Sequence, residues 1–228
     1  TVLLSHHVTG WENLALVRRI EDTYHCPVVM ENDANAVALG ENLYGAGRGS
    51  ANMLYLTIST GIGGGLILDN RLRRGEHGVA GEVGHMVVRP GGPLCSCGNR
   101  GCLEALASGP AIAQRARNAL AAGAPGPLLL SLVGGRIQDI TAQTVFSAAA
   151  ADDLGLAIAM VCSIVDPGCV VIGGGVAKAG DLLLDPVRAS FMRFSFPMTA
   201  ERVRIVQAQA LDEGGLLGAA ALIAQLLL

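Results

Sequence analysis

The stretch GEVGHMVVRPGGPLCSCGNRGCLE, residues 81–104, gathers one histidine, three cysteines and two glutamates within 24 residues. Cys95, Cys97 and Cys102 offer thiolates, and His85 offers an imidazole. Three cysteines and a histidine are a set of ligands that holds zinc in a closed, tetrahedral, structural site. Two glycines lie between the last two cysteines and allow the tight backbone reversal that such a site requires. The stretch therefore predicts a structural zinc loop.

The alternative for these cysteines is a disulfide framework. A bridge between Cys95 and Cys97 would be strained, because only one residue separates them. The other cysteines, Cys26, Cys162 and Cys169, are isolated in the sequence and are expected to be small buried hydrophobic residues. This pattern fits a reducing compartment, so we expect zinc rather than disulfides and a cytoplasmic location.

The two ends of the opening stretch, GEVGH and CSCGNRGCLE, resemble the ROK family of bacterial sugar kinases and sugar-responsive repressors. Four more blocks resemble that family in the family's order. They are MENDANAVALGE (30–41), TISTGIGGGLI (57–67), ASGPAI (107–112) and VVIGGGVA (170–177). Within the family, CSCGNRGCLE resembles the glucokinase and N-acetylamino-sugar kinase branches more than the fructokinase branch.

The composition is that of an ordinary globular chain, with 51% hydrophobic and 15% charged residues among 228. A net charge of −3 with scattered basic residues gives no electrostatic footprint for nucleic acid, and we expect Arg71, Arg73 and Arg74 to be a solvated hairpin edge. The longest apolar run, residues 216–228, is too short to span a bilayer. We therefore expect neither a membrane nor a nucleic-acid partner for this chain.

Strand and helix patterns alternate along the chain, which favours an α/β fold. The patterns predict helices over residues 13–24, 33–43, 111–122, 144–165 and 215–228 and from about 180, and strands over 1–4, 28–30, 52–59, 169–172 and 203–207. The glycine- and proline-rich residues 123–135 are expected to form a loop or a short irregular insertion.

The resemblance to the ROK family implies an actin-like, ribonuclease-H-like fold of two lobes around a cleft. On that basis residues 1–32 end the N-terminal lobe, with the terminal helix 215–228 packed on it. Residues 33–214 form the C-terminal lobe, which contains the zinc loop 85–102. We also expect a homodimer.

Asp33 is the candidate general base, because phosphoryl transfer to a sugar hydroxyl needs a carboxylate that accepts the hydroxyl proton. The alternative is that Asp33 or Asn35 caps the helix that follows, and the sequence alone favours this cap for Asp33 over a catalytic role. The resemblance assigns the family's catalytic aspartate to Asp33 and its sugar-binding asparagine to Asn32.

Glu82, His85 and Glu104 match the family's other sugar-binding positions, and carboxylates and imidazole can bind pairs of sugar hydroxyls. If one ring nitrogen of His85 binds zinc, the other is fixed as an N–H donor that can face the sugar. Taken singly, each glutamate is better explained as a solvated charge, but its neighbours in the motif favour sugar binding.

Two glycine-rich segments are candidates for binding ATP, with Mg as its partner ion. Thr60, Gly61 and Gly63 lie in an expected hairpin turn that differs from a Walker loop or a dinucleotide fingerprint. Backbone N–H groups and a threonine hydroxyl make a phosphate cradle reasonable there, although a flexible turn explains the glycines too. The second segment, Gly173, Gly174 and Gly175, follows a buried strand and precedes a helix at whose N-terminus a nucleotide can sit.

One family block does not occur in residues 1–228, namely the Asp-x-Gly-Gly-Thr sequence with which ROK kinases begin. The nearest match, Asp212-Glu213-Gly214-Gly215, better resembles the entry to the family's terminal helix. We therefore expect a chain truncated at its N-terminus. Three functions stay open: an ATP-dependent kinase of a hexose or N-acetylhexosamine, a sugar-sensing repressor whose helix-turn-helix lies upstream, and an inactive remnant.

Overall fold

A five-stranded sheet forms the centre of the structure, which is a computed structural model that describes residues 14–142, 145 and 148–227. The strands are β1 (Met53–Ile58), β2 (Ile62–Leu68), β3 (Arg71–Arg73), β4 (Cys169–Gly173) and β5 (Arg204–Gln207). Their order is β3-β2-β1-β4-β5. The first three strands pair antiparallel, whereas β4 is parallel to both β1 and β5.

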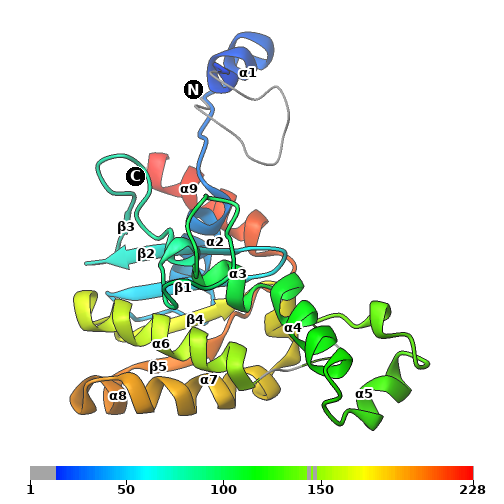
Figure 1. Cartoon of the computed structure of the whole chain (residues 1–228). Helices are drawn as coiled ribbons and strands as arrows, with labels where there is room; N and C mark the ends of the chain where they lie inside the picture. Colours follow the sequence, from blue (N-terminus) through cyan, green and yellow to red (C-terminus); the bar gives the residue numbers. More distant parts are fainter. Residues whose placement is uncertain (1–13, 143–144, 146–147, 228) are drawn as a thin grey trace.

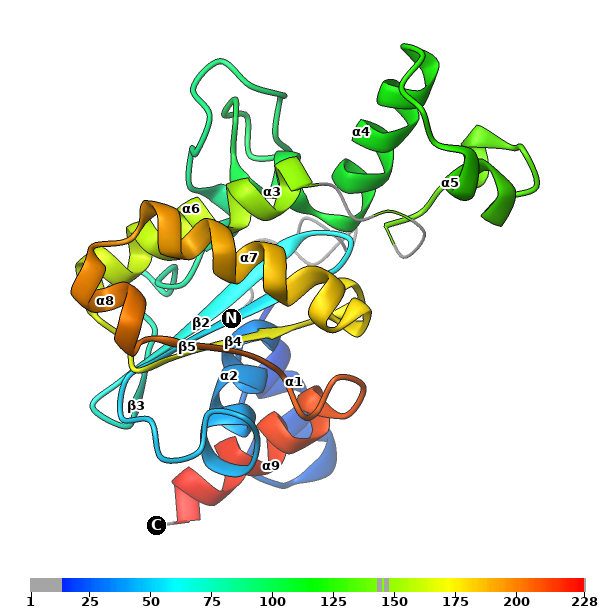
Figure 2. The same cartoon turned by 90° about the horizontal axis from the view of Figure 1, so that it is seen from below.

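Alternating side chains of the two central strands face two separate cores, because successive residues of a strand point to opposite faces. On β1, Leu54 and Leu56 enter one core while Met53 and Tyr55 enter the other, and β4 alternates in the same way. Both faces of the sheet are therefore covered. Helices α6 (Ala148–Val165), α7 (Asp181–Phe194) and α8 (Pro197–Arg202) lie on one side, and α2 (Asp33–Tyr44) and α9 (Gly214–Leu227) lie on the other (Figures 1 and 2).

Helices α2 and α9 pack with their backbones close together. A Cβ on Gly40 of α2 would lie 2.9 Å from the backbone nitrogen of Gly218, and a Cβ on Gly218 would overlap the backbone carbonyl of Ala36. Buried Glu41 fixes the same region, since its carboxylate accepts the N–H groups of Ala46 and Ala210, each at 2.7 Å. Helix α9 thus packs closely on α2, and its expected packing on residues 1–32 stays a prediction.

We expect Gly218→Ala to lower the free energy of unfolding by about 1–3 kcal/mol, because the added methyl group forces two helix backbones apart. Gly215→Ala, in the same helix, is the matched control, since a Cβ there meets nothing within 4 Å. Its effect is expected to stay within about 1 kcal/mol. Urea unfolding of both variants checks this, and equal stabilities would contradict the close approach of the two helices.

The remaining helices extend from this framework. Helices α1 (Leu16–Tyr24), α3 (Leu103–Ala107), α4 (Gly109–Ala121) and α5 (Pro127–Leu132) accompany the 3-10 turns η1 (Val83–His85), η2 (Ile137–Asp139) and η3 (Gly175–Ala179). Figure 1 shows α1 apart from the sheet at the end of an extended segment, and α4 and α5 projecting at one side. Within the described residues, no helix is both long enough and apolar enough to cross a membrane.

Several expectations from the sequence need correction. Residues 28–30 are not a strand, and Met30 is exposed, because no strand of the described residues lies beside them to pair with their backbone. Residues 123–135 contain helix α5, which begins at Pro127, a residue well suited to the first helical position. The predicted strand over residues 1–4 and the start of the helix predicted from residue 144 lie outside the described residues.

Candidate active site and metal loop

The first turn of α2 presents the two residues predicted to bind and deprotonate the sugar. Asn32 is the N-cap, since its side-chain oxygen accepts the N–H of Asn35 at 3.1 Å. The prediction that Asp33 or Asn35 caps this helix is therefore wrong, because the cap is Asn32, the residue before Asp33. Asp33 is the first helical residue, is exposed, and accepts the N–H of Ala34 at 2.8 Å. The cap is filled by Asn32, so the Asp33 carboxylate keeps lone pairs for a ligand.

Glu31, a residue that no sequence motif predicted to be functional, holds this turn in place. Its carboxylate accepts the Asn32 N–H at 3.0 Å, the Asn35 side-chain amide at 3.1 Å, and Nε of Arg74 at 2.5 Å. Arg74 is 50% exposed, as expected for a solvated hairpin edge, but its guanidinium also pairs with a carboxylate that is only 9% exposed. Arg74 comes directly after β3, so this pair ties the start of α2 to the antiparallel edge of the sheet.

Glu104, on α3, contacts the turn of the β1–β2 hairpin. One carboxylate oxygen accepts the N–H of Ile62 at 2.9 Å. The other accepts the hydroxyl of Ser96 at 3.3 Å, and Ser96 lies in the metal loop, the predicted zinc loop of residues 85–102. A Cβ on Gly61 would come within 2.5 Å of the same carboxylate. Glu104 is thus held between the hairpin and the loop by two hydrogen bonds. The alternative interpretation, a solvated charge without partners, does not describe it.

The GEVGH motif lies against the same end of β2. Glu82 is exposed and precedes the 3-10 turn that ends at His85, whose N–H donates to the Glu82 carbonyl at 3.1 Å. A Cβ on Gly84 would overlap the Ile62 carbonyl, so the turn and β2 touch backbone to backbone. Ala34 of α2 lies near Gly63, where a Cβ would meet its methyl group at 3.4 Å. The beginning of β2 therefore brings together the starts of α2, the 3-10 turn and α3.

The four predicted metal ligands converge in the folded chain. The ligand atoms of His85, Cys95, Cys97 and Cys102 all lie within 4.8 Å of one another. Tetrahedral zinc, with bonds of about 2.3 Å to sulfur and about 2.0–2.1 Å to nitrogen, separates two sulfurs by about 3.8 Å and sulfur from nitrogen by about 3.6 Å. The observed separations are 3.7 Å from Cys97 to Cys102 and 3.6 Å from Cys95 to Nδ1 of His85. The residues fit zinc, whereas a disulfide needs its sulfurs at about 2.05 Å.

Backbone bonds shape the loop around these ligands. The Cys95 N–H donates to Asn99 O at 2.8 Å, and the Leu103 N–H donates to Met86 O at 2.9 Å. Gly101 has φ of 82°, and a Cβ there would overlap the carbonyl oxygen of Arg89, so only glycine fits. The loop is therefore folded on itself by local contacts, as the spacing of its glycines predicts.

The thiols of the metal-free loop differ in acidity. Burial raises the pKa of Cys102 to about 12, and its neighbouring thiols act in the same direction. A hydrogen bond from the backbone of Asn99 lowers the pKa of Cys97. A bound zinc ion keeps its ligands deprotonated, so the buried Cys102 is the ligand whose charge depends most on the metal.

A cavity of about 440 Å³ is lined by residues of the same hairpin turn. Its lining includes Ser59 and Thr60 from the turn, Gly109 and Pro110 from the start of α4, and Gly175 after β4. Of the residues predicted to bind nucleotide, Thr60 and Gly175 line this cavity, whereas Gly61, Gly63, Gly173 and Gly174 do not. The helix whose start lines this cavity is α4. The sequence predicted that α7 would do so, but the 3-10 turn η3 lies between β4 and α7.

Packing explains the two glycines that end β4. A Cβ on Gly173 would meet the hydroxyl of Tyr55 at 2.5 Å, and a Cβ on Gly174, with φ of 85°, would overlap the Ile58 carbonyl. These residues let the chain pass across the end of β1 and bring Gly175 to the cavity.

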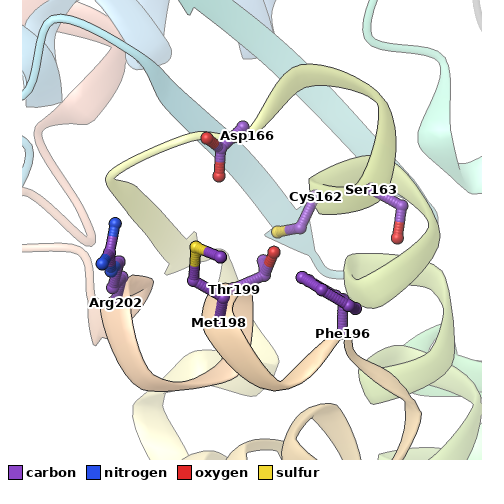
Figure 3. Close-up of a pocket in the computed structure, with 7 residues that line it drawn as sticks. All are labelled: Cys162, Ser163, Asp166, Phe196, Met198, Thr199 and Arg202. Carbon is purple, nitrogen blue, oxygen red and sulfur yellow. The ribbon is translucent and has the colours of Figure 1, made fainter.

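A second cavity, of about 330 Å³, lies between the end of α6 and α8 (Figure 3). None of the predicted site residues lines it. Its buried Cys162 is a poor nucleophile, because burial raises the pKa of this thiol to about 12. Cys162 and Cys169 are buried as expected, whereas Cys26 is exposed, because it follows α1, a helix without buried residues.

Comparison with known proteins identifies the family of the chain. A model of the ROK family matches residues 1–226. The chain belongs to the ROK family. It is 38% identical over 230 residues to the glucokinase of Halalkalibacterium halodurans, an alignment that covers 95% of this chain and 69% of that protein. The predicted resemblance to glucokinases is therefore confirmed, and the chain is partial relative to such relatives.

Solved ROK structures share the fold. The structure of a ROK family glucokinase from Streptomyces griseus in complex with glucose and AMPPNP matches with a TM-score of 0.85 at 37% identity, over 99% of this chain and 77% of that one. A ROK family transcriptional regulator, a homologue of the E. coli MLC protein, matches with a TM-score of 0.83 at 32% identity, over 99% of this chain and 59% of that one. The predicted actin-like α/β fold is confirmed.

Proposed function

We propose that the complete protein containing this chain transfers the γ-phosphoryl group of ATP to a hydroxyl of glucose or of an N-acetylated hexosamine. The observation that carries this proposal is the meeting of groups around the β1–β2 hairpin. Its β2 side contacts the starts of α2 and α3 and the metal loop, whereas Ser59 and Thr60 at its tip line the cavity. Phosphoryl transfer needs an acceptor site and a nucleotide site next to each other, and here both include residues of one turn.

In this proposal Asp33 accepts the proton of the sugar hydroxyl as the oxygen attacks the γ-phosphorus and ADP leaves with the electrons of the broken bond. Asn32, Glu82, His85 and Glu104 hold the other sugar hydroxyls. The sugar thereby keeps one oxygen beside Asp33, and alignment of this kind supplies much of the catalysis in phosphoryl transfer.

ATP is assigned to the cavity beside Thr60 and Gly175. Gly173 and Gly174 bring Gly175 to this cavity, whereas Gly61 and Gly63 let the same hairpin approach Glu104 and Ala34. Magnesium bound to ATP neutralises charge on the phosphates. Similarity to a glucokinase structure containing glucose and AMPPNP supports both substrates. Zinc at His85, Cys95, Cys97 and Cys102 has a structural role: it leaves one nitrogen of His85 as a fixed donor toward the sugar.

The sugar preference is tested by steady-state ADP formation with a panel of acceptors: glucose, N-acetylglucosamine, N-acetylmannosamine, fructose and no sugar. We expect kcat/KM to be highest for glucose or an N-acetylated hexosamine. Turnover of fructose alone would contradict the assignment.

A sugar-sensing repressor is the second candidate, favoured by the similarity to the ROK transcriptional regulator. In that case the sugar site is used for binding without turnover. The two functions separate in one pair of measurements on the complete protein: a kinase forms ADP with sugar, whereas a repressor binds sugar without ADP formation and binds DNA through a segment outside this chain.

We also propose the two-lobe division at residues 32 and 33, a cytoplasmic location and a homodimer. Exposed apolar side chains around the start of α8 motivate the dimer, since Phe196 is 64% exposed and Met198 53% exposed. Light scattering of the purified complete protein tests it, and a monomer mass at micromolar concentration would refute it.

A further inference from the structure

Asp153 is a buried carboxylate on α6 that none of the roles above explains. Its side chain is 2% exposed. One carboxylate oxygen lies 2.6 Å from Nε of Arg89, and the other lies 2.8 Å from Nη1 of Arg115. The same Nη1 also donates to the carbonyl of Leu106 at 3.0 Å. A single buried carboxylate therefore joins two arginines from different parts of the chain.

Each arginine belongs to an element of the proposed site. Arg89 lies in the metal loop between His85 and Cys95, and its N–H donates at 3.1 Å to the carbonyl of Gly101, the residue before Cys102. Arg115 lies on α4, whose first turn lines the cavity. Through Leu106 it also contacts the last turn of α3, the short helix that carries Glu104. Asp153 thus connects α6 to the metal loop, to α3 and to α4.

Stability alone is a weak explanation for this triad. Buried ion pairs are often replaced by apolar residues of similar volume with little or no loss of stability, because desolvation offsets much of the attraction. The sequence around Asp153 on α6 is otherwise mostly apolar. A carboxylate with two fixed partners differs from an apolar residue mainly in setting the relative position of the elements that it joins.

We propose that Asp153 is a positioning residue, which holds the metal loop and α3 against the core so that His85 and Glu104 face the sugar. This inference rests on the proposed function for its effect on the sugar, but its effect on the metal is independent of turnover. Loss of the carboxylate frees Arg89 and loosens the segment between two zinc ligands. Residues that orient zinc ligands indirectly typically contribute about 10–100-fold in metal affinity.

The test compares Asp153→Asn with Asp152→Asn. Asp152 is the neighbouring residue on the same helix and is also paired with an arginine, Arg193 at 2.6 Å, but this arginine lies on α7, away from the metal loop. Zinc-loaded complete protein is mixed with a chromogenic chelator, and the rate of zinc transfer and the KM values for sugar and ATP are measured. We expect Asp153→Asn to release zinc about 10-fold faster or more and to raise the KM for sugar, with both quantities unchanged in Asp152→Asn.

If Asp153 only stabilised the fold, Asp153→Asn would lower the melting temperature without faster zinc release. Gly218→Ala serves as a variant destabilised far from the loop, and it is expected to lower the melting temperature without faster zinc release. Unchanged zinc release and unchanged sugar KM in folded Asp153→Asn would overturn the proposal. If Asp153→Asn does not fold, Arg89→Met carries the same expectation, because it leaves the Asp153–Arg115 pair in place. If the unaltered protein phosphorylates no sugar, the proposed function fails, while zinc release still decides the role of Asp153.

Discussion

Asp33→Asn in the complete protein is expected to lower kcat by about 10²–10⁴-fold, the usual contribution of a general base. The KM for the sugar should change little, because the amide keeps the shape of the side chain and can still accept the N–H of Ala34. The amide cannot take the hydroxyl proton, so only the chemical step is impaired. Steady-state kinetics with varied glucose and saturating ATP separate the two parameters.

The control for this variant is Asp181→Asn. Asp181 is also the first residue of a helix, α7, so its loss removes a similar favourable interaction with a helix dipole. Both variants should therefore lose a similar, small amount of stability, about 0.3–1 kcal/mol, while only Asp33→Asn loses turnover. Near-normal turnover in Asp33→Asn would assign the proton to another group and leave Asp33 as a helix-stabilising residue.

Cys102→Ser is expected to abolish zinc binding and to disorder the loop between His85 and Cys102. Structural zinc sites supply apparent binding energies of order 10 kcal/mol, and the loop has few apolar groups to replace that contribution. Glucose binding should fail with it, because Glu104 follows Cys102 by two residues and accepts a hydrogen bond from Ser96 of the loop. Elemental analysis and calorimetric titration with glucose measure the two effects.

Cys162→Ser is the matched control, since Cys162 is likewise a buried thiol but lies on α6 outside the cluster. It is expected to lose stability while keeping its zinc.

The unaltered 228-residue chain, purified without chelator, should contain about one equivalent of zinc because the ligands fold through local contacts. A content below about half an equivalent would falsify the closed site with three cysteines and one histidine.

The metal loop was predictable from sequence because its determinants are local. The ligands lie within a short segment, and the glycines between the last two cysteines indicate the turn that joins them. The nearly continuous apolar segments that became β1 and β4 were found for a similar reason, since buried central strands carry this signal. Boundaries of those elements differ by a residue or two from prediction.

The buried polar contacts were not predictable, because they depend on tertiary neighbours. Glu31 lies within the block MENDANAVALGE, but its partner Arg74 is 43 positions away, so no local sequence pattern indicates the pair. A weak signal did exist for Asp153: it is an acidic residue in a largely alanine, leucine and isoleucine segment of α6. A charge in such a segment indicates a buried partner, although it does not say which.

The glycine-rich segments show how one residue type serves two purposes. The sequence assigned six residues to nucleotide binding, and only Thr60 and Gly175 line the cavity. Gly173 and Gly174 instead allow close passage by Tyr55 and Ile58. Sequence reports that a side chain is disfavoured at such a position, but not whether a ligand or a strand occupies the space.

Mass spectrometry of the sugar after incubation of the complete protein with ATP, magnesium and glucose or N-acetylglucosamine tests the proposed phosphoryl transfer most directly. We expect a product heavier than the sugar by one phosphoryl group, formed together with ADP in equal amounts and in far smaller quantity by Asp33→Asn. Unchanged sugar in the presence of zinc-loaded, sugar-binding protein would contradict the kinase assignment and leave a sugar sensor as the function of this chain.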